Sequence, residues 1–360
     1  MKKGFVKKLM AVGLSAVMML ALAACGETPA DGENTTDTNV TVDNNTDTDV
    51  TDIADVEVEA GATYNVAIVK QLDHASLDEI ANAIAAELDA IAADKGITIT
   101  YTIYSGQNDQ STLKQITDQA VADGVDAIIP IATLAAQVAA VSAEDSETPV
   151  VYAAISDPVA AELTGIPYVT GTSDGLNTNF IMDMMFAQNA DIQKVGLLYS
   201  LSEVNSATPI ADAKAYLDAK GIEYVEATAN TNDEVVSAAS TLIANGVDVI
   251  FTPTDNVIMA AELAIYEDLA SAGILHYAGA DSFVRNGAFA TCGVNYTALG
   301  TKTADLAFQA ITAGMTGMED YYLMDGGIIT VNTETALAAN ADYAVFSDMG
   351  EVIEVLTSED

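Results

Sequence analysis

The chain contains the run Asp123-Gly124-Val125-Asp126-Ala127-Ile128, and 122 positions later the similar run Asn245-Gly246-Val247-Asp248-Val249-Ile250. In both runs a glycine separates a helical pattern from a short apolar strand pattern. The correspondence continues in the same order over two further pairs of segments, residues 131–134 with 253–256 and residues 152–155 with 277–280. Three matched units in one order predict two lobes of similar structure.

Around these runs, short β-rich stretches alternate with amphipathic helical stretches from residue 63 onward. We predict strands at residues 64–69, 97–104, 125–130, 149–154 and 194–199, and helices at residues 77–93, 111–122, 133–143 and 299–312. This alternation is typical of an α/β fold with parallel sheets. In open sheets of this kind the loops after the strands share one edge, where ligands bind.

The composition excludes several classes of function. The chain has 360 residues, 12 basic and 53 acidic, with a net charge of −41. Such a surplus of acids excludes direct nucleic-acid binding and argues against electrostatic docking on anionic lipid, because both need clustered cations. Two histidines and two cysteines leave little scope for a metal site, and no metal or cofactor motif is present. We therefore expect neither a metal nor a cofactor.

The first 24 residues have the pattern of a signal peptide. Four lysines within residues 2–8 precede an apolar stretch at residues 9–24, which is short for a membrane-spanning helix. It ends in Leu22-Ala23-Ala24-Cys25-Gly26, which resembles the lipobox of bacterial lipoproteins. We predict lipidation of Cys25 and anchoring to the outer face of the cell membrane. The alternative is an ordinary signal peptide with an incidental cysteine.

Residues 25–62 are rich in Thr, Asp, Asn and Glu and have few large apolar residues. Such a segment buries too little surface to offset its ordering entropy, so we interpret it as an acidic tether. A calcium site within residues 43–52 is an alternative. Without a scaffold to fix the carboxylates, the plain tether is favoured.

Short hydroxyl, amide and carboxylate side chains are concentrated in the loops that follow the predicted strands. Each is also of a type that caps helices or stabilises turns, so any one of them alone has a structural explanation. Their convergence on one edge favours a polar cleft. The candidate ligand-binding residues are His74, Gln107, Thr133, Ala135, Ser156, Asp157, Glu203, Asn205, Ser206, Thr254, Asp255, Asn256 and Asp281.

A zwitterionic ligand fits this chemistry. Arg285 is the single arginine of the chain, so a bound carboxylate would depend on helix N-termini and hydroxyl groups. We expect the side chains of Thr133, Ser156 and Ser206 to contact the carboxylate. The ammonium group would pair with Asp281 or Asp255.

One enzymatic pattern is present. Residues 171–175, Gly-Thr-Ser-Asp-Gly, match the G-x-S-x-G nucleophile elbow. The elbow requires a helix directly after the serine and a downstream histidine, and His276 is the single candidate. Because residues 171–175 fall where the chain should pass between lobes, we predict that the protein is not an enzyme.

The loops together resemble a known family. His74-Ala75-Ser76-Leu77-Asp78, Ser156-Asp157-Pro158-Val159-Ala160 and Pro253-Thr254-Asp255-Asn256 are similar to motifs of the ABC-transporter substrate-binding lipoproteins that include tryptophan- and tyrosine-binding members. So are residues 109–116, 132–137, 170–174 and 203–206. The family's Asn-Ala-Gln-Gly-Asp loop stands here as Ser105-Gly106-Gln107-Asn108-Asp109. The segment after Asn340 also departs from the family pattern.

The resemblance implies a type I periplasmic-binding-protein fold, with two doubly wound parallel-sheet lobes joined by a three-strand hinge. The expected N-terminal lobe is residues 63–171 plus 296–323, and the expected C-terminal lobe is residues 174–292 plus 327–360. Residues 171–174 would then be a hinge crossing in which small residues absorb backbone rotation.

The resemblance also implies a function. We expect an extracytoplasmic lipoprotein of an ABC importer that captures an aromatic or other apolar amino acid and delivers it to a permease and its ATPase. A sugar- or nucleoside-binding protein of the same fold is the main alternative, although the absence of Trp weighs against a sugar. A hydrolase using Ser173 and a surface adhesin or sensor domain are further alternatives.

Overall fold

The computed structural model describes residue 56 and residues 58–358. The expected signal peptide, Cys25, residues 43–52 and most of the tether therefore lie outside the described residues. Within the described part, no helix combines the length and hydropathy that a membrane span needs.

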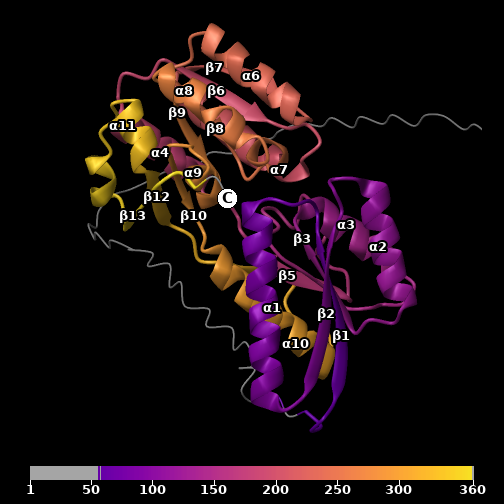
Figure 1. Cartoon of the computed structure of the whole chain (residues 1–360). Coiled ribbons are helices and arrows are strands. Elements are labelled where there is room, and N and C mark those ends of the chain that lie inside the picture. The colour runs from indigo at the N-terminus through magenta and orange to yellow at the C-terminus, as the bar shows by residue number, and fades with distance from the viewer. Residues whose placement is uncertain (1–55, 57, 359–360) are drawn as a thin grey trace, which may run out of the picture. The chain divides into compact units, whose positions relative to one another are not determined.

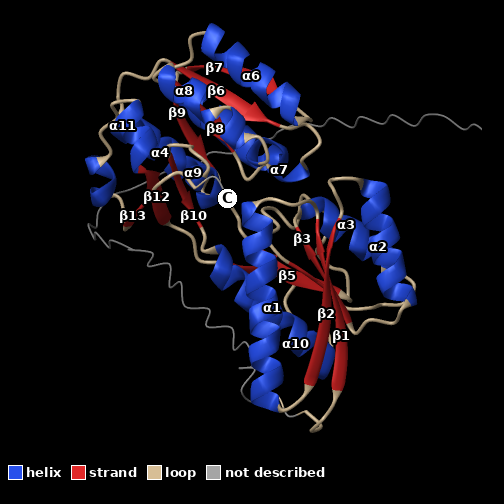
Figure 2. Cartoon of the chain, in the orientation of Figure 1, coloured by secondary structure: helices blue, strands red, loops and turns tan. Residues whose placement is uncertain are grey.

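The first sheet has six strands in the order β11-β5-β4-β3-β1-β2, and every neighbouring pair is parallel. Helices cover both of its faces (Figures 1 and 2). The strands are β1 (Thr63–Lys70), β2 (Thr98–Ser105), β3 (Ala127–Ile131), β4 (Val150–Tyr152), β5 (Val169–Ser173) and β11 (Tyr322–Leu323). The helices are α1 (Ala75–Lys95), α2 (Gln110–Ala122), α3 (Thr133–Ser142) and α10 (Tyr296–Ala313).

Strand β1 shows why helices must cover both faces of its sheet. Its residues alternate between faces, as the period of a strand requires. Val66 and Ile68 belong to the core formed with α1 and α10, whereas Ala67 and Val69 belong to the core formed with α2 and α3. An apolar run without polar alternation therefore places β1 in the middle of three layers.

The second sheet has seven strands in the order β13-β12-β10-β9-β8-β6-β7. All neighbours are parallel except β10 and β12. The strands are β6 (Lys194–Tyr199), β7 (Glu223–Thr228), β8 (Val249–Thr252), β9 (Leu275–Ala278), β10 (Ala290–Gly293), β12 (Ile328–Asn332) and β13 (Val352–Val355). The α-helices are α4 (Thr178–Gln188), α5 (Ala207–Lys220), α6 (Asn232–Ala244), α7 (Asn256–Met259), α8 (Tyr266–Ser271), α9 (Asp281–Arg285) and α11 (Thr333–Ala338). Three 3-10 helices complete the described elements: η2 (Val204–Ser206), η3 (Glu262–Ala264) and η4 (Ala344–Asp348).

The predicted repetition is confirmed by the strand orders. The segment β4-β3-β1-β2 of the first sheet corresponds strand for strand to β9-β8-β6-β7 of the second. The repeated glycines have the same structural role, because Gly124 and Gly246 adopt positive φ angles of 70° and 65° after helices α2 and α6. This conformation ends a helix at little cost for glycine. The fold is thus an α/β fold of two doubly wound lobes.

The predicted elements are confirmed, with small shifts at several of their ends. Strand β4 stops at Tyr152, two residues before the predicted end, because Ala154 has a φ of 58° and leaves the extended conformation. Strand β3 begins at Ala127 rather than Val125. The amide of Val125 still bonds the carbonyl of Ala120 in the turn that closes α2.

The chain passes between the sheets three times. These passages lie between β5 and α4, between β10 and α10, and between β11 and β12. Gly171 in β5 has a φ of 157°, and a Cβ atom there would lie 2.1 Å from the carbonyl oxygen of Tyr152. The strand that leads into the first passage, β5, therefore requires glycine at position 171.

Candidate functional site

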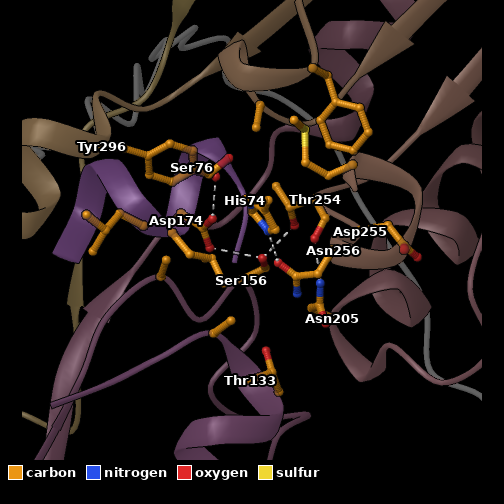
Figure 3. Close-up of a pocket in the computed structure, with 17 residues that line it drawn as sticks. His74, Ser76, Thr133, Ser156, Asp174, Asn205, Thr254, Asp255, Asn256 and Tyr296 are labelled. Atoms are coloured by element: carbon orange, nitrogen blue, oxygen red, sulfur yellow. Dashed lines mark hydrogen bonds between the residues drawn. The ribbon is translucent and has the colours of Figure 1, made fainter. Parts of the chain in front are cut away.

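A cavity lies where the carboxyl ends of strands from both sheets meet. Figure 3 shows its polar lining, to which both lobes contribute. Its volume is about 20 Å³, enough for about one water molecule. Seven of the predicted residues line it: His74, Thr133, Ser156, Asn205, Thr254, Asp255 and Asn256.

The other predicted residues lie around the cavity or away from it. Glu203 and Ser206 are buried and bond residues that line it, and Ala135 is buried in the first turn of α3. Gln107 is exposed and donates to Asp73 and Ser105. Asp157 accepts from the Ala160 amide and the Thr208 hydroxyl, and Asp281 lines a different cavity.

Residues that sequence reasoning missed complete the site. Ser76, Asp174 and Tyr296 line the cavity together with the apolar side chains of Leu77, Ile80, Met259 and Phe283. Gln71 lies next to it and is only 1% exposed. A signal for Gln71 was available, because it directly follows the apolar strand β1, whereas Asp174 follows β5, in which Thr, Gly and Ser predominate. Tyr296 follows a passage between the sheets, and nothing local in the sequence marks it.

Four side-chain hydrogen bonds join the lobes across the cavity, and we call them the cleft bridges. Gln71 Nε2 donates to Glu203 Oε1 at 2.8 Å, and His74 Nε2 contacts Asn256 Oδ1 at 3.0 Å. The hydroxyl groups of Ser156 and Thr254 lie 2.8 Å apart. The fourth bridge joins the hydroxyl groups of Ser76 and Ser282. The lobes are thus held together directly, with polar groups of one satisfying those of the other.

Gln71 fixes one side of these bridges. Its side-chain oxygen Oε1 accepts a hydrogen bond from the backbone amide of Leu134 at 3.0 Å. Its side-chain nitrogen Nε2 donates to both Asn108 and Glu203. Helix α3 begins after Ala132, which has no side-chain cap to offer and a φ of 76°. Gln71 therefore supplies an acceptor that a capping side chain would otherwise provide.

Glu203 is a buried carboxylate bound only by amide donors. It accepts from Gln71 and, at 2.7 Å, from Asn256 Nδ2, and none of the ion pairs among the described residues includes it. Burial, reinforced by the nearby charge of Asp255, raises the pKa of Glu203 to about 7. Glu203 would therefore gain from a cationic neighbour.

Asp255 has a structural role at the start of α7. One oxygen accepts from the amides of Val257 and Ile258, each at 3.1 Å. The other accepts from the Ser200 amide and the Ser206 hydroxyl, both at 2.7 Å. Burial raises its pKa despite these four donors. Both oxygens are thus occupied by groups of its own lobe.

Asp174 is a further buried carboxylate that none of the ion pairs among the described residues includes. It accepts from Ser156 at 2.9 Å and from the Tyr296 hydroxyl at 3.0 Å. Its burial raises the pKa of the carboxyl group. Asp174 lines the cavity with two neutral hydroxyl groups as its side-chain donors (Figure 3).

The hydrogen bonds of Asn256 define the tautomer of His74. Asn256 Nδ2 donates to Glu203, so its Oδ1 is the acceptor that faces His74 Nε2. The proton then resides on Nε2, and His74 Nδ1 is a buried acceptor without a hydrogen bond. Burial lowers the pKa of His74. His74 therefore presents a neutral ring to the cavity.

The helices near the cleft differ among themselves in how they begin, because Asp255 caps α7 whereas three others lack a side-chain cap. The residues before α1, α3 and α5 make no side-chain cap bond. By contrast α2, α4, α6 and α10 are capped by Asp109, Asn177, Thr231 and Asn295. The first amides of a helix have no intrahelical partner and attract anions. The cleft therefore combines helix ends suited to an anion with buried acids suited to a cation.

The residues of the G-x-S-x-G pattern do not form a nucleophile elbow. Ser173 ends β5, and the next helix begins five residues later at Thr178. The ring nitrogens of His276 contact Glu262 at 2.9 Å and Thr252 at 2.8 Å. Both nitrogens are thus engaged inside the second lobe, so His276 is not placed as a base for Ser173.

Two doubly wound lobes with a polar cleft at the carboxyl ends of their strands define a two-lobed ligand-binding protein. The sequence profile of a family described as ABC transporter substrate binding protein matches residues 65–339. The chain belongs to this family and is a substrate-binding protein of the ABC-transporter type.

Two of the proteins similar to this chain are associated with aromatic amino acids. A tyrosine-binding protein of Clostridioides difficile (strain R20291) is 29% identical over 279 residues, covering 76% of this chain and 80% of the relative. The structure of a Streptococcus pneumoniae ABC domain in complex with L-Trp has a TM-score of 0.74 and 26% identity, covering 81% of this chain and all of the other.

A third similar protein has a further property. It is a substrate-binding protein with adhesive properties from Clostridium difficile, seen in a ligand-free, open structure. Its TM-score is 0.62 and its identity 27%, covering 82% of this chain and all of the other.

Proposed function

We propose that this protein captures an aromatic amino acid in the cleft and delivers it to a membrane permease powered by an ATPase. The observation that carries the proposal is Asp174, a buried carboxylate on the cavity wall with two hydroxyl donors and no cation. An α-ammonium group supplies the missing charge. The relatives that bind tyrosine and tryptophan support the same ligand class.

In the proposed complex the two ends of the zwitterion bind to different elements. The ammonium group lies between Asp174 and Glu203, since Asp255 already accepts four hydrogen bonds from its own lobe and Asp281 lies outside this cavity. The carboxylate lies at the start of α3, where Thr133 adds a hydroxyl group and the helix end attracts an anion. Ser156 lies between these two regions and can contact either end.

The aromatic side chain of the ligand would pack on an apolar wall. Leu77 and Ile80 come from α1, Met259 from the end of α7, and Phe283 from α9. These side chains form part of a core cluster that includes buried residues of both lobes. An aromatic ring between them would replace contacts that the lobes now make directly, and burial of its surface would favour binding.

The remaining parts of the proposal concern location and motion. Lipidated Cys25 anchors the chain outside the cell membrane, and residues 25–62 act as its tether. The N-terminal lobe comprises residues 63–171 plus 296–323, and the C-terminal lobe residues 174–292 plus 327–360. The three passages between the sheets form the hinge. Mass spectrometry of the membrane fraction would reveal an acylated N-terminal Cys25 peptide, and an unmodified peptide would contradict the anchor.

Isothermal titration against the twenty amino acids tests the ligand class. We expect tyrosine or tryptophan to bind, and Asp174→Asn to weaken that binding by about 10- to 100-fold, because a charged hydrogen bond is lost. Asp218→Asn, the same change on the exposed face of α5, should leave the affinity unchanged. Binding of a sugar or nucleoside instead of any amino acid would refute the proposal.

A further inference from the structure

A second cavity of about 280 Å³ lies beside the passage between β10 and α10. Its walls come from both lobes, with Glu79 of α1 and Thr297 of α10 on one side and Asp281 and Arg285 of α9 on the other. It shares only Tyr296 with the lining of the cleft cavity. The two cavities therefore have different linings, with Tyr296 as the one residue common to both.

Two buried oxygen atoms on this lining have no hydrogen bond. They are Oδ1 of Asp281 and Oγ1 of Thr291. Thr291 is only 1% exposed, so solvent does not satisfy its hydroxyl group. Leaving such groups unpaired is costly, and nearly all buried polar atoms in folded proteins have a partner. Both atoms can accept a hydrogen bond, and Asp281 can only accept while it is ionised.

The charges on the lining favour a cation. Arg285 is contacted by Glu79 at 2.6 Å and by Asp281 at 3.1 Å, and Glu79 also accepts from Thr297 at 2.8 Å. Two carboxylates around one guanidinium leave a formal charge of −1. Burial, and next the charge of Glu79, raise the pKa of Asp281, while Arg285 lowers it. A second cation would relieve this imbalance, whereas an anion would be repelled.

Apolar side chains also line the cavity, beside the polar residues Asn295 and Thr330. Val294, Ile328, Ile353 and Val355 line the cavity with the polar groups. No group of three metal-binding side chains occurs among the residues that the structure describes. A bare metal ion would thus lack ligands, while an organic cation could place its ammonium at Asp281 and its carbon chain on the aliphatic wall.

We propose that this second cavity binds a small primary alkylammonium ion, whose N–H groups bond Asp281 Oδ1 and Thr291 Oγ1. The site is independent of the amino-acid cleft in its lining and in its ligand. Because its walls come from both lobes, an occupied site also stabilises their present arrangement.

Titration calorimetry of the whole protein with n-butylammonium chloride tests this assignment. We expect one binding event, with affinity reduced about five- to tenfold by Thr291→Val and more than about tenfold by Asp281→Asn. Thr98→Val, the same change at an exposed position of β2, should have no effect. 1-Butanol, which has the same carbon chain without the charge, should not bind detectably.

The outcomes separate this proposal from that of the cleft. Absence of butylammonium binding, or equal affinity in wild type, Thr291→Val and Asp281→Asn, would overturn the second site. Displacement of butylammonium by tyrosine with one-to-one competition would place it in the cleft and also overturn the assignment. If no amino acid binds but butylammonium does so with the expected variant effects, the cleft proposal fails and the second site stands.

Discussion

Glu203 shows how one residue makes the cleft sensitive to pH. Its carboxylate is buried between the lobes and held by two amides, so ionisation is costly there and its pKa is about 7. In the unfolded chain a glutamate titrates near its ordinary value of about 4.3. Between these two values the folded protein therefore holds a proton that the unfolded chain has released.

The sign of the pH effect on stability follows. Where the folded state binds more protons, the free energy of unfolding falls as pH rises. Glu203 should therefore reduce stability between about pH 4.3 and 7, by on the order of 2–3 kcal/mol. Urea denaturation across this range should show a decline that Glu203→Gln removes. Glu144→Gln, at an exposed position, should retain it, and identical pH profiles for Glu203→Gln and wild type would argue against this origin.

The candidate site was partly predictable residue by residue. Polar residues after predicted strands pointed to His74, Ser156 and Thr254, which line the cavity because the ends of parallel strands share an edge. The same pattern did not reveal that Asp255 is saturated by donors of its own lobe. It also missed Tyr296, whose approach to Asp174 depends on a passage 122 residues further along the chain. Which side chains meet across such a separation in sequence depends on the tertiary fold, and local sequence patterns do not reveal it.

At the scale of elements, strand β5 depends on a residue without a side chain. Gly171 packs against Tyr152 of β4, with which it is paired in the sheet. The elements themselves were predictable, because the spacing of apolar residues, the glycines at helix ends and the helix-capping residues all indicate the same local structure. Their boundaries were less so, as the early end of β4 shows. That end depends on the left-handed backbone of Ala154, which local propensity does not predict for alanine.

Substitution of Gly171 measures this packing requirement. Gly171→Ala places a Cβ atom 2.1 Å from the Tyr152 carbonyl oxygen, so the strands must separate or the backbone must shift. We expect a loss of stability of at least about 2 kcal/mol by thermal or chemical denaturation. Gly165→Ala is the matched control, because Gly165 has a φ of 71° with no atom within 4 Å. Its cost should be only about 1 kcal/mol. Equal losses in both variants would mean that the close approach is relieved without cost.

At the scale of the whole molecule, the cleft bridges set the balance between joined and separated lobes. Thr254→Val with Ser282→Ala removes two of the four bridges while leaving the backbone bonds of each lobe in place. At about 1 kcal/mol for each hydrogen bond, the equilibrium should shift about thirtyfold toward separation. Small-angle scattering of the ligand-free protein should show a larger radius of gyration.

The control for this experiment is Ser240→Ala with Thr241→Val on α6. These hydroxyl groups are exposed and bond carbonyls of their own helix. The control should scatter like the wild type, and tyrosine should return the Thr254→Val, Ser282→Ala variant toward the wild-type radius. A double variant as compact as wild type would mean that other contacts between the lobes, such as the Arg285–Glu79 ion pair or apolar packing, hold them together.

The cleft bridges also have a consequence for the speed of capture. A cavity of about 20 Å³ cannot admit an amino acid, so entry must wait until the bridges break. The rate of uptake should then rise with ligand concentration only until it equals the rate of spontaneous opening, and remain constant beyond that point. The apparent dissociation constant equals the intrinsic one divided by the fraction of time that the bridges are broken. Weakening a bridge would thus accelerate capture without touching the ligand.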